Sequence, residues 1–297
     1  MGIPSIERRR RRLGYVFLLP SFAILGAFLF YPVVNSLIMS FTDWTGFGNG
    51  FAWIGFDNYV RMFADMPDFW ASLGVNLKFA VITSVVQTIL GFLLAFGVYQ
   101  LTQRWQKFYQ IALYVPVILP AAAVAVMWVF MYDPNFGLIN QFLYAVGLDS
   151  LAKGWLGEPG TALASVIVTN TWRYVGFSMI LYYIAMLDIS KEILESSTID
   201  GATKLKQLRH FFLPLTWGTT EINFMLSLIG GMKSFDMFYL MTGGGPGTST
   251  QVVGMLIYRE AFQNFRFSSA LTMSVILFVV ILIITVISRT LLKPKEL

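Results

Sequence analysis

The sequence predicts an all-α membrane protein that crosses the bilayer about six times. Its 297 residues are 56% hydrophobic and only 12% charged, and the mean hydropathy is +0.66. In soluble domains about a quarter of the residues are charged, so this composition indicates lipid as the main solvent. Six apolar runs also reach the roughly 20 residues that a helix needs to cross the hydrocarbon core. They cover residues 13–41, 76–101, 109–132, 161–187, 217–241 and 267–290.

Basic residues predict which side of the membrane each loop faces. In the six-span arrangement, the loops on one side carry only Arg61, Lys153, Arg259 and Arg266. The positive-inside rule places the other, more basic side in the cytosol, together with both ends of the chain and the loop at residues 188–216. The basic side carries Arg8–Arg12, Arg104, Lys107, Lys191, Lys204, Lys206, Arg209, Arg289, Lys293 and Lys295.

The N-terminal arginines have two other interpretations. The formal charge of +5 suggests nucleic-acid binding, but Arg8–Arg12 stand directly before the first apolar run, where a topology signal is expected. A secretory signal would also begin with basic residues and an apolar core. This run is too long for such a signal and continues past Pro32 to Phe41, so we expect a retained helix.

Several classes of site are excluded by composition. The chain has no cysteine and a single histidine, His210, which leaves no basis for a disulfide, a thiolate metal site or a histidine-ligated metal. It also lacks a Gly-x4-Gly-Lys-Ser/Thr phosphate loop. We therefore expect no catalytic group, metal or cofactor in this chain. The expected organisation is a basic cytosolic N-terminus at residues 1–12, one six-span domain at 13–290 and a cytosolic C-terminus at 291–297.

The loop at residues 188–216 is longer than a connection between two spans requires. Asp200-Gly201 predicts a turn, in which Gly201 takes a positive φ at the end of a short helix and Asp200 caps the next helix. This second helix is expected over residues 202–212, with Pro214 in the first turn of the next span. Its apolar face is expected from Leu205, Leu208 and Phe212. Such a hairpin could rest on the inner leaflet or dock in a partner's groove, and the pattern alone favours neither.

This loop resembles the EAA loop of permeases in binding-protein-dependent ABC importers. Glu195, Gly201 and Leu213-Pro214 have the spacing of that motif, and Asp200-Gly201-Ala202 matches the Asp-Gly-Ala at its centre. The chain departs from the motif at Ser196-Ser197, where an alanine pair is usual, at Phe211, where isoleucine is commoner, and at Ser190, where proline is usual.

The resemblance extends along nearly the whole chain and is to the carbohydrate branch, the maltose and glycerol-3-phosphate type. It includes IGFDNY at residues 54–59, Trp172-Arg173, Gly176-Phe177, residues 185–187 and TGGGPGTST at residues 242–250. It implies a type I ABC importer fold with a cytosolic coupling helix. The residues that it assigns to ATPase coupling are Glu195, Ser196, Ser197, Asp200, Gly201, Ala202, Leu213 and Pro214.

The same resemblance implies a non-catalytic permease of a bacterial cytoplasmic (inner) membrane. Its expected partners are a second permease in a heterodimer, two ATPase subunits that hold ATP and Mg, and an extracytoplasmic solute-binding protein. The expected cargo is a sugar, an oligosaccharide, or a related polyol or glycerol phosphate, moved by alternating access. The sequence does not identify the solute.

Two helix faces are candidates for contact with the solute. In each of them four residues recur at i, i+3, i+4 and i+7, so they share a face. An arginine in mid-span costs about 2.5–3.5 kcal/mol on insertion scales, so the first face should meet water or protein rather than lipid. Aromatic rings beside hydrogen-bonding groups also suit a sugar. The two sets are Asn170, Arg173, Tyr174 and Phe177, and Ser227, Gly230, Gly231 and Ser234.

Close helix packing is the competing interpretation of the second face, since small residues four apart commonly serve it in membranes. Both faces fall where the resembling sugar permeases line their translocation cavity. Asn170 is identical there, whereas Arg173, Tyr174 and the two glycines are substitutions.

Other polar residues have simpler expected roles. Lys233 and Asp236 are expected to neutralise each other, and Glu221 to extend toward the cytosolic end of its span. The glycine-rich stretch Gly243–Pro246 permits tight turns, and the family resemblance also makes Gly243, Gly244, Gly245 and Pro246 candidates for an outer gate or a contact with the binding protein.

Three rival function classes fit the sequence less well. An ion-coupled secondary transporter would more naturally show inverted repeats or mid-span carboxylates, and neither is evident. A membrane scaffold would leave the polar spans without a purpose. An intramembrane enzyme would require a constellation of reactive side chains that is lacking.

Overall fold

The computed structural model describes residues 15, 17–48 and 50–293, and their secondary structure is helical apart from an isolated bridge between Thr42 and Trp53. The predicted cytosolic arginines, Arg8–Arg12, lie outside the described residues, as do residues 294–297 of the expected C-terminal tail. The chain divides into two compact units. One comprises Met1–Pro67 and Ile257–Ile276, and the other comprises Asp68–Leu256 and Leu277–Leu297.

The first unit contains an apolar helix over Phe17–Met39, which includes a π-helical turn, η1 (Gly26–Phe30), followed by α2 (Tyr31–Met39). It also holds α3 (Asp57–Asp65), η4 (Arg259–Gln263) and the beginning of α15 (Phe267–Leu292). Side chains satisfy the carbonyls where the first helix ends. Asn58 Nδ2 donates to the Ser40 carbonyl at 2.9 Å, and Thr272 Oγ1 donates to the same carbonyl at 3.1 Å.

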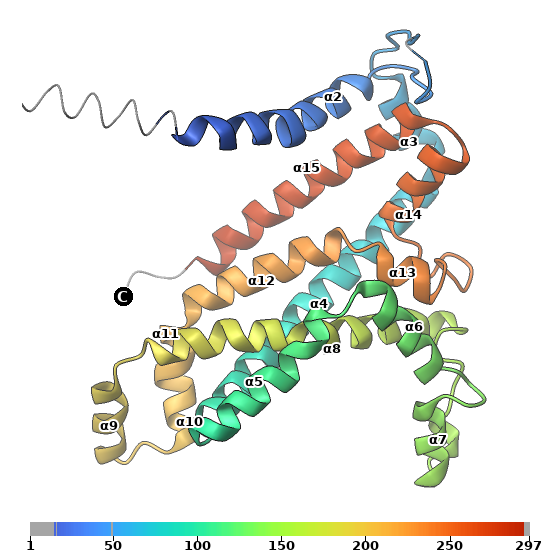
Figure 1. Cartoon of the computed structure of the whole chain (residues 1–297). Coiled ribbons are helices and arrows are strands. Elements are labelled where there is room, and N and C mark those ends of the chain that lie inside the picture. The colour runs from blue at the N-terminus through green and yellow to red at the C-terminus, as the bar shows by residue number, and fades with distance from the viewer. Residues whose placement is uncertain (1–14, 16, 49, 294–297) are drawn as a thin grey trace, which may run out of the picture. The chain divides into compact units, whose positions relative to one another are not determined.

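The second unit is a helical bundle with a short hairpin at one end (Figure 1). Its long helices are α4 (Pro67–Tyr99), α5 (Gln103–Ile118), α6 (Ala121–Met131), α8 (Pro159–Leu187), α12 (Trp217–Met232) and the last part of α15. Its short elements are α7 (Leu138–Ala145), η2 (Asp149–Leu151), α9 (Lys191–Ile199), α10 (Lys204–Gln207), η3 (Leu208–Phe212), α11 (Leu213–Leu215), α13 (Asp236–Met241) and α14 (Val253–Tyr258).

The span expected over residues 109–132 is not one straight helix. It is divided into α5 and α6, which meet at a bend of 98°. Pro120 is the cause, because proline disfavours helical geometry in the preceding residue, and Leu119 is accordingly extended with ψ at 138°. The span expected over residues 217–241 is also broken, into α12 and α13.

The described residues include three helices that are long and apolar enough to cross a membrane, and the bent pair counts as a fourth if it is one span. The three are Phe17–Met39, Pro67–Tyr99 and Phe267–Leu292. The polar face around Asn170 and Arg173 lowers the hydropathy of α8, and α12 is only 16 residues long. The count of six spans therefore stays a prediction.

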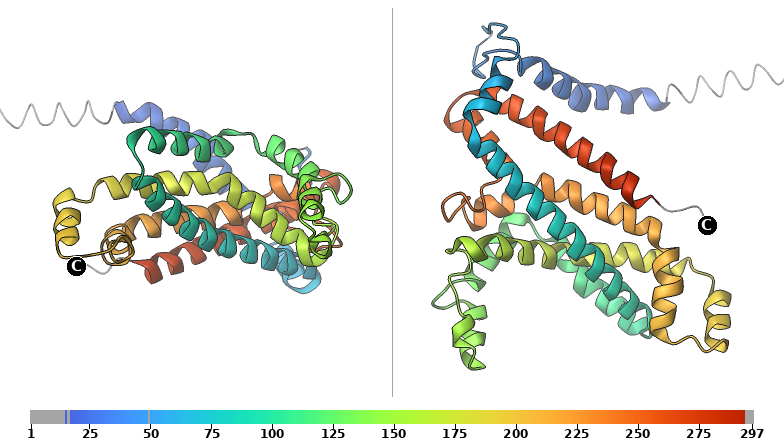
Figure 2. Two further views of the ribbon diagram at one scale, coloured as in Figure 1. Left: turned by 90° about the horizontal axis from the view of Figure 1, so that it is seen from below. Right: turned by 180° about the vertical axis from the view of Figure 1, so that it is seen from behind.

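Helix α8 lies at the centre of the second unit and packs against α5, α6 and α12 (Figures 1 and 2). Three glycines permit close packing of helices in this unit, two of them at α8. A Cβ at Gly176 would collide with the Leu113 carbonyl of α5, and one at Gly91 would meet Ser178 of α8. A Cβ at Gly231 would lie 2.7 Å from Ala80 Cα in α4. These contacts bring helix backbones together as small residues do in membrane bundles.

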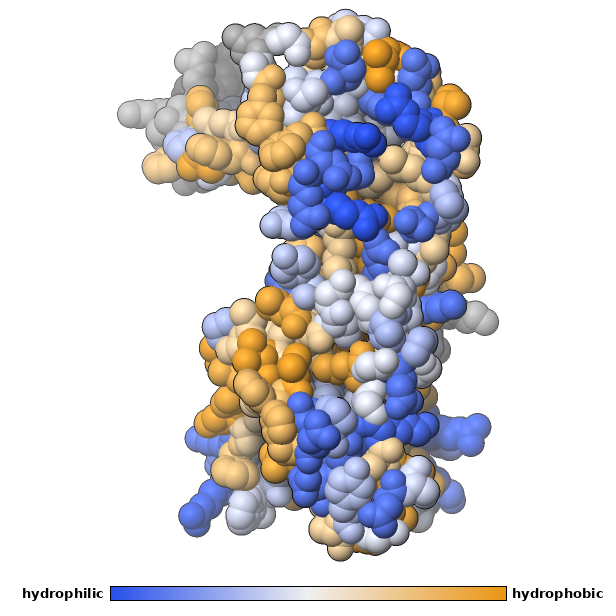
Figure 3. All heavy atoms as spheres, turned by 90° about the vertical axis from the view of Figure 1, so that its right-hand side faces the viewer, coloured by the Kyte–Doolittle hydropathy of each residue, from blue (hydrophilic) through white to orange (hydrophobic). Residues whose placement is uncertain are grey.

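Much of the apolar surface is exposed rather than buried, and Figure 3 shows contiguous areas of it on one face. Within α4, Ile89 and Leu93 are about half exposed, as are Ile283 and Val286 in α15. A soluble protein rarely exposes such continuous apolar surface, whereas lipid covers it at no cost. The distribution agrees with the predicted membrane environment.

Replacing Gly176 by alanine tests the packing of α5 on α8. We expect Gly176→Ala to destabilise the protein by about 1–3 kcal/mol, because the added methyl group must displace the Leu113 carbonyl. Thermal unfolding in detergent measures the loss. Gly97→Ala is the matched control, since nothing lies within 4 Å of a Cβ there. Equal melting temperatures for the two variants would contradict this packing.

Candidate functional site

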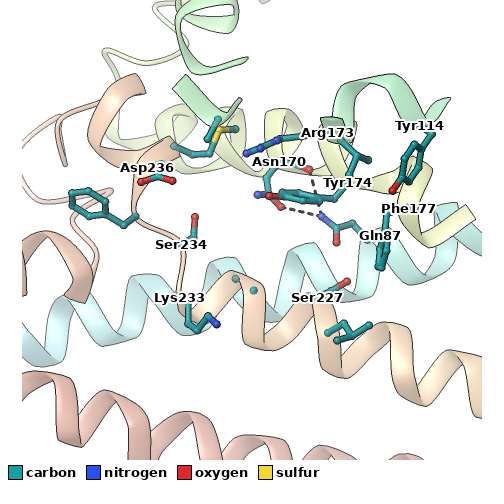
Figure 4. Close-up of a pocket in the computed structure, with 17 residues that line it drawn as sticks. Gln87, Tyr114, Asn170, Arg173, Tyr174, Phe177, Ser227, Lys233, Ser234 and Asp236 are labelled. Atoms are coloured by element: carbon teal, nitrogen blue, oxygen red, sulfur yellow. Dashed lines mark hydrogen bonds between the residues drawn. The ribbon is translucent and has the colours of Figure 1, made fainter. Parts of the chain in front are cut away.

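A cavity of about 500 Å³ lies beside α8 in the second unit (Figure 4). We call it the α8 cavity. Its walls come from α4, α5, α6, α8, α12 and α13, together with the break between α12 and α13. All eight residues that the sequence nominates for solute contact line this cavity: Asn170, Arg173, Tyr174, Phe177, Ser227, Gly230, Gly231 and Ser234. The two helix faces therefore converge on one site, and their role in solute contact stays a prediction.

Gln87 of α4 is a further cavity residue that the sequence analysis missed. Its Nε2 donates to Asn170 Oδ1 at 2.9 Å, and both side chains are buried (Figure 4). The bond leaves the Asn170 amide nitrogen as the end of that side chain still able to donate. Gln87 belongs to a polar series in α4 with Asn76, Thr83 and Ser84, whose helical spacing is the signal that could have found it.

Arg173 binds protein atoms within the cavity wall. Its Nη2 donates to the Leu119 carbonyl at 3.0 Å, and its guanidinium carbon lies 4.9 Å from the centre of the Tyr174 ring. Its Nε is buried and has no hydrogen-bond partner. The guanidinium is thus directed at the bend between α5 and α6.

The two glycines of the second face differ in their surroundings. Gly231 is buried, and a Cβ there would meet Ala80, so packing explains it. Nothing lies within 4 Å of a Cβ at Gly230, which also lines the cavity, so packing does not require a glycine at that position. On this face, helix packing accounts for Gly231, whereas contact with the solute stays the interpretation for Gly230.

One expectation about charges is wrong. Lys233 and Asp236 do not form an ion pair; among the described residues the ion pair is that of Arg289 and Glu221, at 3.9 Å. Arg289 lies in the last turn of α15, at the predicted cytosolic end of that span, so the expected direction of Glu221 stays a prediction. Lys233 ends α12 and Asp236 begins α13, where their charges complement the helix dipoles. Both line the α8 cavity as separate charges (Figure 4).

Polar bonds continue from the cavity along α12. Asn223 Nδ2 donates to Thr88 Oγ1 of α4 at 3.1 Å, and Tyr182 of α8 donates to Thr220 at 3.0 Å. Thr220 and Asn223 precede Ser227 along α12, so the bonds extend toward the hairpin end of the unit. Asn223 is fully buried and its Oδ1 has no partner.

The loop at residues 188–216 forms the expected hairpin, with the Gly201 turn confirmed and the Asp200 cap corrected. Gly201 has φ +77° and closes α9, with its amide bonded to the Thr198 carbonyl and that of Ala202 bonded to the Ser197 carbonyl. These two bonds define a Schellman motif. Asp200 does not cap the second helix; Thr203 does, by accepting from the Lys206 amide at 3.4 Å.

The second helix begins at Lys204, and it becomes π-helical in η3 before Pro214. Leu205 is 73% exposed, so it does not share a buried face with Phe212, contrary to the expectation. Phe212 packs on the Phe96 and Tyr99 rings of α4. Pro214 lies in α11, and α12 starts only after Thr216.

Gln207 is the residue that holds the hairpin together, and the sequence analysis did not single it out. Its Nε2 lies within donating distance of the Leu194 carbonyl (3.2 Å), Ser197 Oγ (2.9 Å) and Thr198 Oγ1 (3.0 Å). Gln207 and Ser197 are buried, whereas Glu195 and Ile199 on the same hairpin are exposed. The hairpin therefore has a bonded inner side and a free outer side that includes an apolar residue.

The glycine-rich stretch forms compact turns. Gly243 and Gly244 have φ of +59° and +91°, a region that other residues rarely adopt. Thr250 Oγ1 donates to the Gly245 carbonyl at 2.7 Å and lies 2.8 Å from Thr242 Oγ1. The sequence here thus serves loop geometry, and its expected gating role stays a prediction.

The chain is similar to membrane components of solute importers. The sequence profile of the family described as binding-protein-dependent transport system inner membrane component matches residues 87–296. The probable ABC transporter permease protein YurN of Bacillus subtilis is 32% identical, with 96% of this chain and 97% of that protein covered. The diacetylchitobiose uptake system permease protein NgcF of Streptomyces coelicolor is 31% identical, with 93% and 82% covered.

A solved structure has the same fold. It is a chain of a bacterial ABC transporter involved in the import of the acidic polysaccharide alginate, with a TM-score of 0.82 and 25% identity over 97% of each chain.

Gln207→Ala tests the bonding of the hairpin. We expect it to cost about 1–3 kcal/mol locally, because it removes a buried donor from three acceptors. Hydrogen–deuterium exchange of the α9 amides should accelerate. Lys206→Ala, at the exposed neighbouring position, is the control and should leave the exchange unchanged. Equal exchange in both variants would show that Gln207 does not hold α9.

Proposed function

Because the chain belongs to the family of inner membrane components of binding-protein-dependent transport systems, we propose that it forms part of the translocation pathway of an ATP-driven importer. The cargo is a sugar or oligosaccharide, or a related polyol or glycerol phosphate. Transport proceeds by alternating access. The chain is a permease subunit without catalytic groups of its own.

The α8 cavity is the observation that carries this proposal. The candidate residues from two separate helices line one space of about 500 Å³, a size typical of small-molecule sites. Aromatic rings of Tyr174 and Phe177 lie beside the polar groups of Asn170 and Ser227. This combination suits a sugar ring, which has apolar faces and hydroxyl edges. The similarity to permeases named for diacetylchitobiose and lactose supports the same class of cargo.

The partners belong to the same proposal. An extracytoplasmic solute-binding protein delivers the cargo, as the family's description indicates for its members. A second permease completes the pathway as a heterodimer, and two ATPase subunits bind ATP and Mg. The protein lies in the bacterial inner membrane with both termini in the cytosol. The four-residue outer stretch Gly243–Pro246 contributes to the outer gate or to the contact with the binding protein.

The hairpin formed by α9 and α10 is the proposed contact with the ATPase. Its Schellman turn exposes Gly201 with open space around it, and the side chain of Ile199 is exposed. Glu195 is also exposed and lines a second cavity beside Gln207 and Thr198. Eight residues form the coupling surface and its support: Glu195, Ser196, Ser197, Asp200, Gly201, Ala202, Leu213 and Pro214. The bonded inner side supports this role, because a rigid element transmits a push better than a mobile loop.

Gly201→Asp tests the coupling role. We expect solute-stimulated ATPase activity of the complex, purified in lipid with its binding protein, to fall at least about tenfold, which corresponds to about 1.4 kcal/mol. The matched control is Gly147→Asp, because Gly147 has a similar φ of +74° and equally open surroundings. Normal ATPase stimulation in Gly201→Asp would refute the coupling role. A complex that purifies without an ATPase would refute the importer itself.

The combined variant Asn170→Ala and Tyr174→Ala tests the cavity. We expect loss of most uptake and of the stimulation of ATPase by a saccharide from a test panel, because a hydrogen-bonding amide and an aromatic surface are both removed. Val168→Ala, at an exposed position of α8, is the control. If the double variant transported and responded like the control, the solute pathway would lie elsewhere.

A further inference from the structure

The α5–α6 bend leaves a backbone carbonyl that its own helices do not satisfy. Leu119 ends α5 with an extended ψ of 138°. The first bond of α6 runs from the Val124 amide to the Pro120 carbonyl, so the Leu119 carbonyl lies outside the hydrogen-bond ladder of α6. Such a carbonyl at a helix end must find its donor in water or elsewhere in the protein.

Arg173 supplies that donor from α8, 54 positions along the chain. Its Nη2 bonds to the Leu119 carbonyl at 3.0 Å, and the positive charge lies at the C-terminal end of α5, which carries the negative end of the helix dipole. The ring of Tyr174, the next residue of α8, lies 4.9 Å beneath the guanidinium carbon. The arginine is thereby held between the bend and an aromatic face.

A second contact fixes α5 independently of the arginine. Gly176, almost one turn further along α8, lies directly against the Leu113 carbonyl. Position along α5 is therefore set by packing at Leu113, whereas Arg173 acts at the end of α5, where the chain turns into α6. Tyr114 and Val117 of α5 and Ala121 of α6 line the α8 cavity on either side of this point.

We propose that Arg173 is a positioning residue that latches the bend between α5 and α6 and thereby sets this wall of the α8 cavity, rather than a ligand of the transported solute. The inference rests on the proposed function of the cavity, but the contact between Arg173 and the α5–α6 bend can be tested independently of that function. One end of the guanidinium is bonded to Leu119, one face lies over Tyr174, and Nε is buried. Asn170 and the serines remain as polar groups for a solute.

The latch can be measured without solute or ATP. The chain contains no cysteine, so two introduced cysteines are the only sites within it that a thiol-reactive spin label modifies. Labels replace Phe130 of α6 and Ile184 of α8, which are 60% and 54% exposed. A reference pair joins Ile111 of α5, which is 66% exposed, to the same Ile184 label. Electron–electron distances are recorded on the full complex in lipid nanodiscs.

We expect Arg173→Met to widen and shift the distance distribution between positions 130 and 184, and to leave that between 111 and 184 unchanged. Arg173→Lys keeps a charged donor of similar reach and should keep the narrow distribution. Lys233→Met is the matched control, because it removes a cation from the same cavity without touching the bend. If Arg173→Met does not fold, Arg173→Gln replaces it, since its neutral amide is too short to reach Leu119.

An unchanged distribution between positions 130 and 184 in the Met or Gln variant would overturn the latch, whatever the protein transports. Saccharide stimulation of ATPase in Arg173→Met gives a second readout. A latch predicts a lower maximal stimulation with the same order of preference across the panel. A changed order of preference, reversed by Arg173→Lys, would identify Arg173 as a solute ligand and also overturn the proposal.

Discussion

Direct contact between helix backbones is the constraint on which the second unit depends. Gly176 brings α5 onto α8, Gly91 brings α4 onto α8, and Gly231 brings α12 onto α4. Because lipid tails are as apolar as leucine, burying apolar side chains gives little driving force inside a bilayer, and close packing must supply it. The helices therefore approach most closely at glycines. Helix α8 takes part in two of these three contacts, as does α4.

Around these contacts, the polar side chains are grouped rather than scattered. Gln87 with Asn170, Thr88 with Asn223, and Tyr182 with Thr220 each join two helices by a hydrogen bond. A buried polar group without a partner is costly, so each pair fixes the rotation of one helix against another. The same pairs extend from the α8 cavity toward the α9–α10 hairpin. Within these three pairs, Asn223 Oδ1 is the atom that is buried without a partner.

The sequence predicts the helix faces and turns of this structure well, but it does not predict the hydrogen bonds between residues of different helices. Helical spacing places Asn170 and Tyr174 on one helix face and Ser227 on another, and Asp-Gly chemistry predicts the Gly201 turn. That the two faces line one cavity is seen only in the tertiary structure. Gln87 shares a helical spacing with other polar residues of α4, but the sequence does not reveal the bonding partner of Gln87 or Gln207, because these partners lie 83 and 10 positions away. The break at Pro120 is missed for a different reason. Hydropathy averages over a window, so a continuous apolar run conceals a local backbone restriction.

The 98° bend has a consequence for the surrounding lipid. Helix α5 has 16 residues and a length of about 24 Å, whereas the hydrocarbon core measures roughly 30 Å. Helix α6 turns away and adds little height, so the apolar belt is shorter here than along the 33-residue α4. We expect this hydrophobic mismatch to be met by local thinning of the bilayer or by short-chain lipids beside the bend.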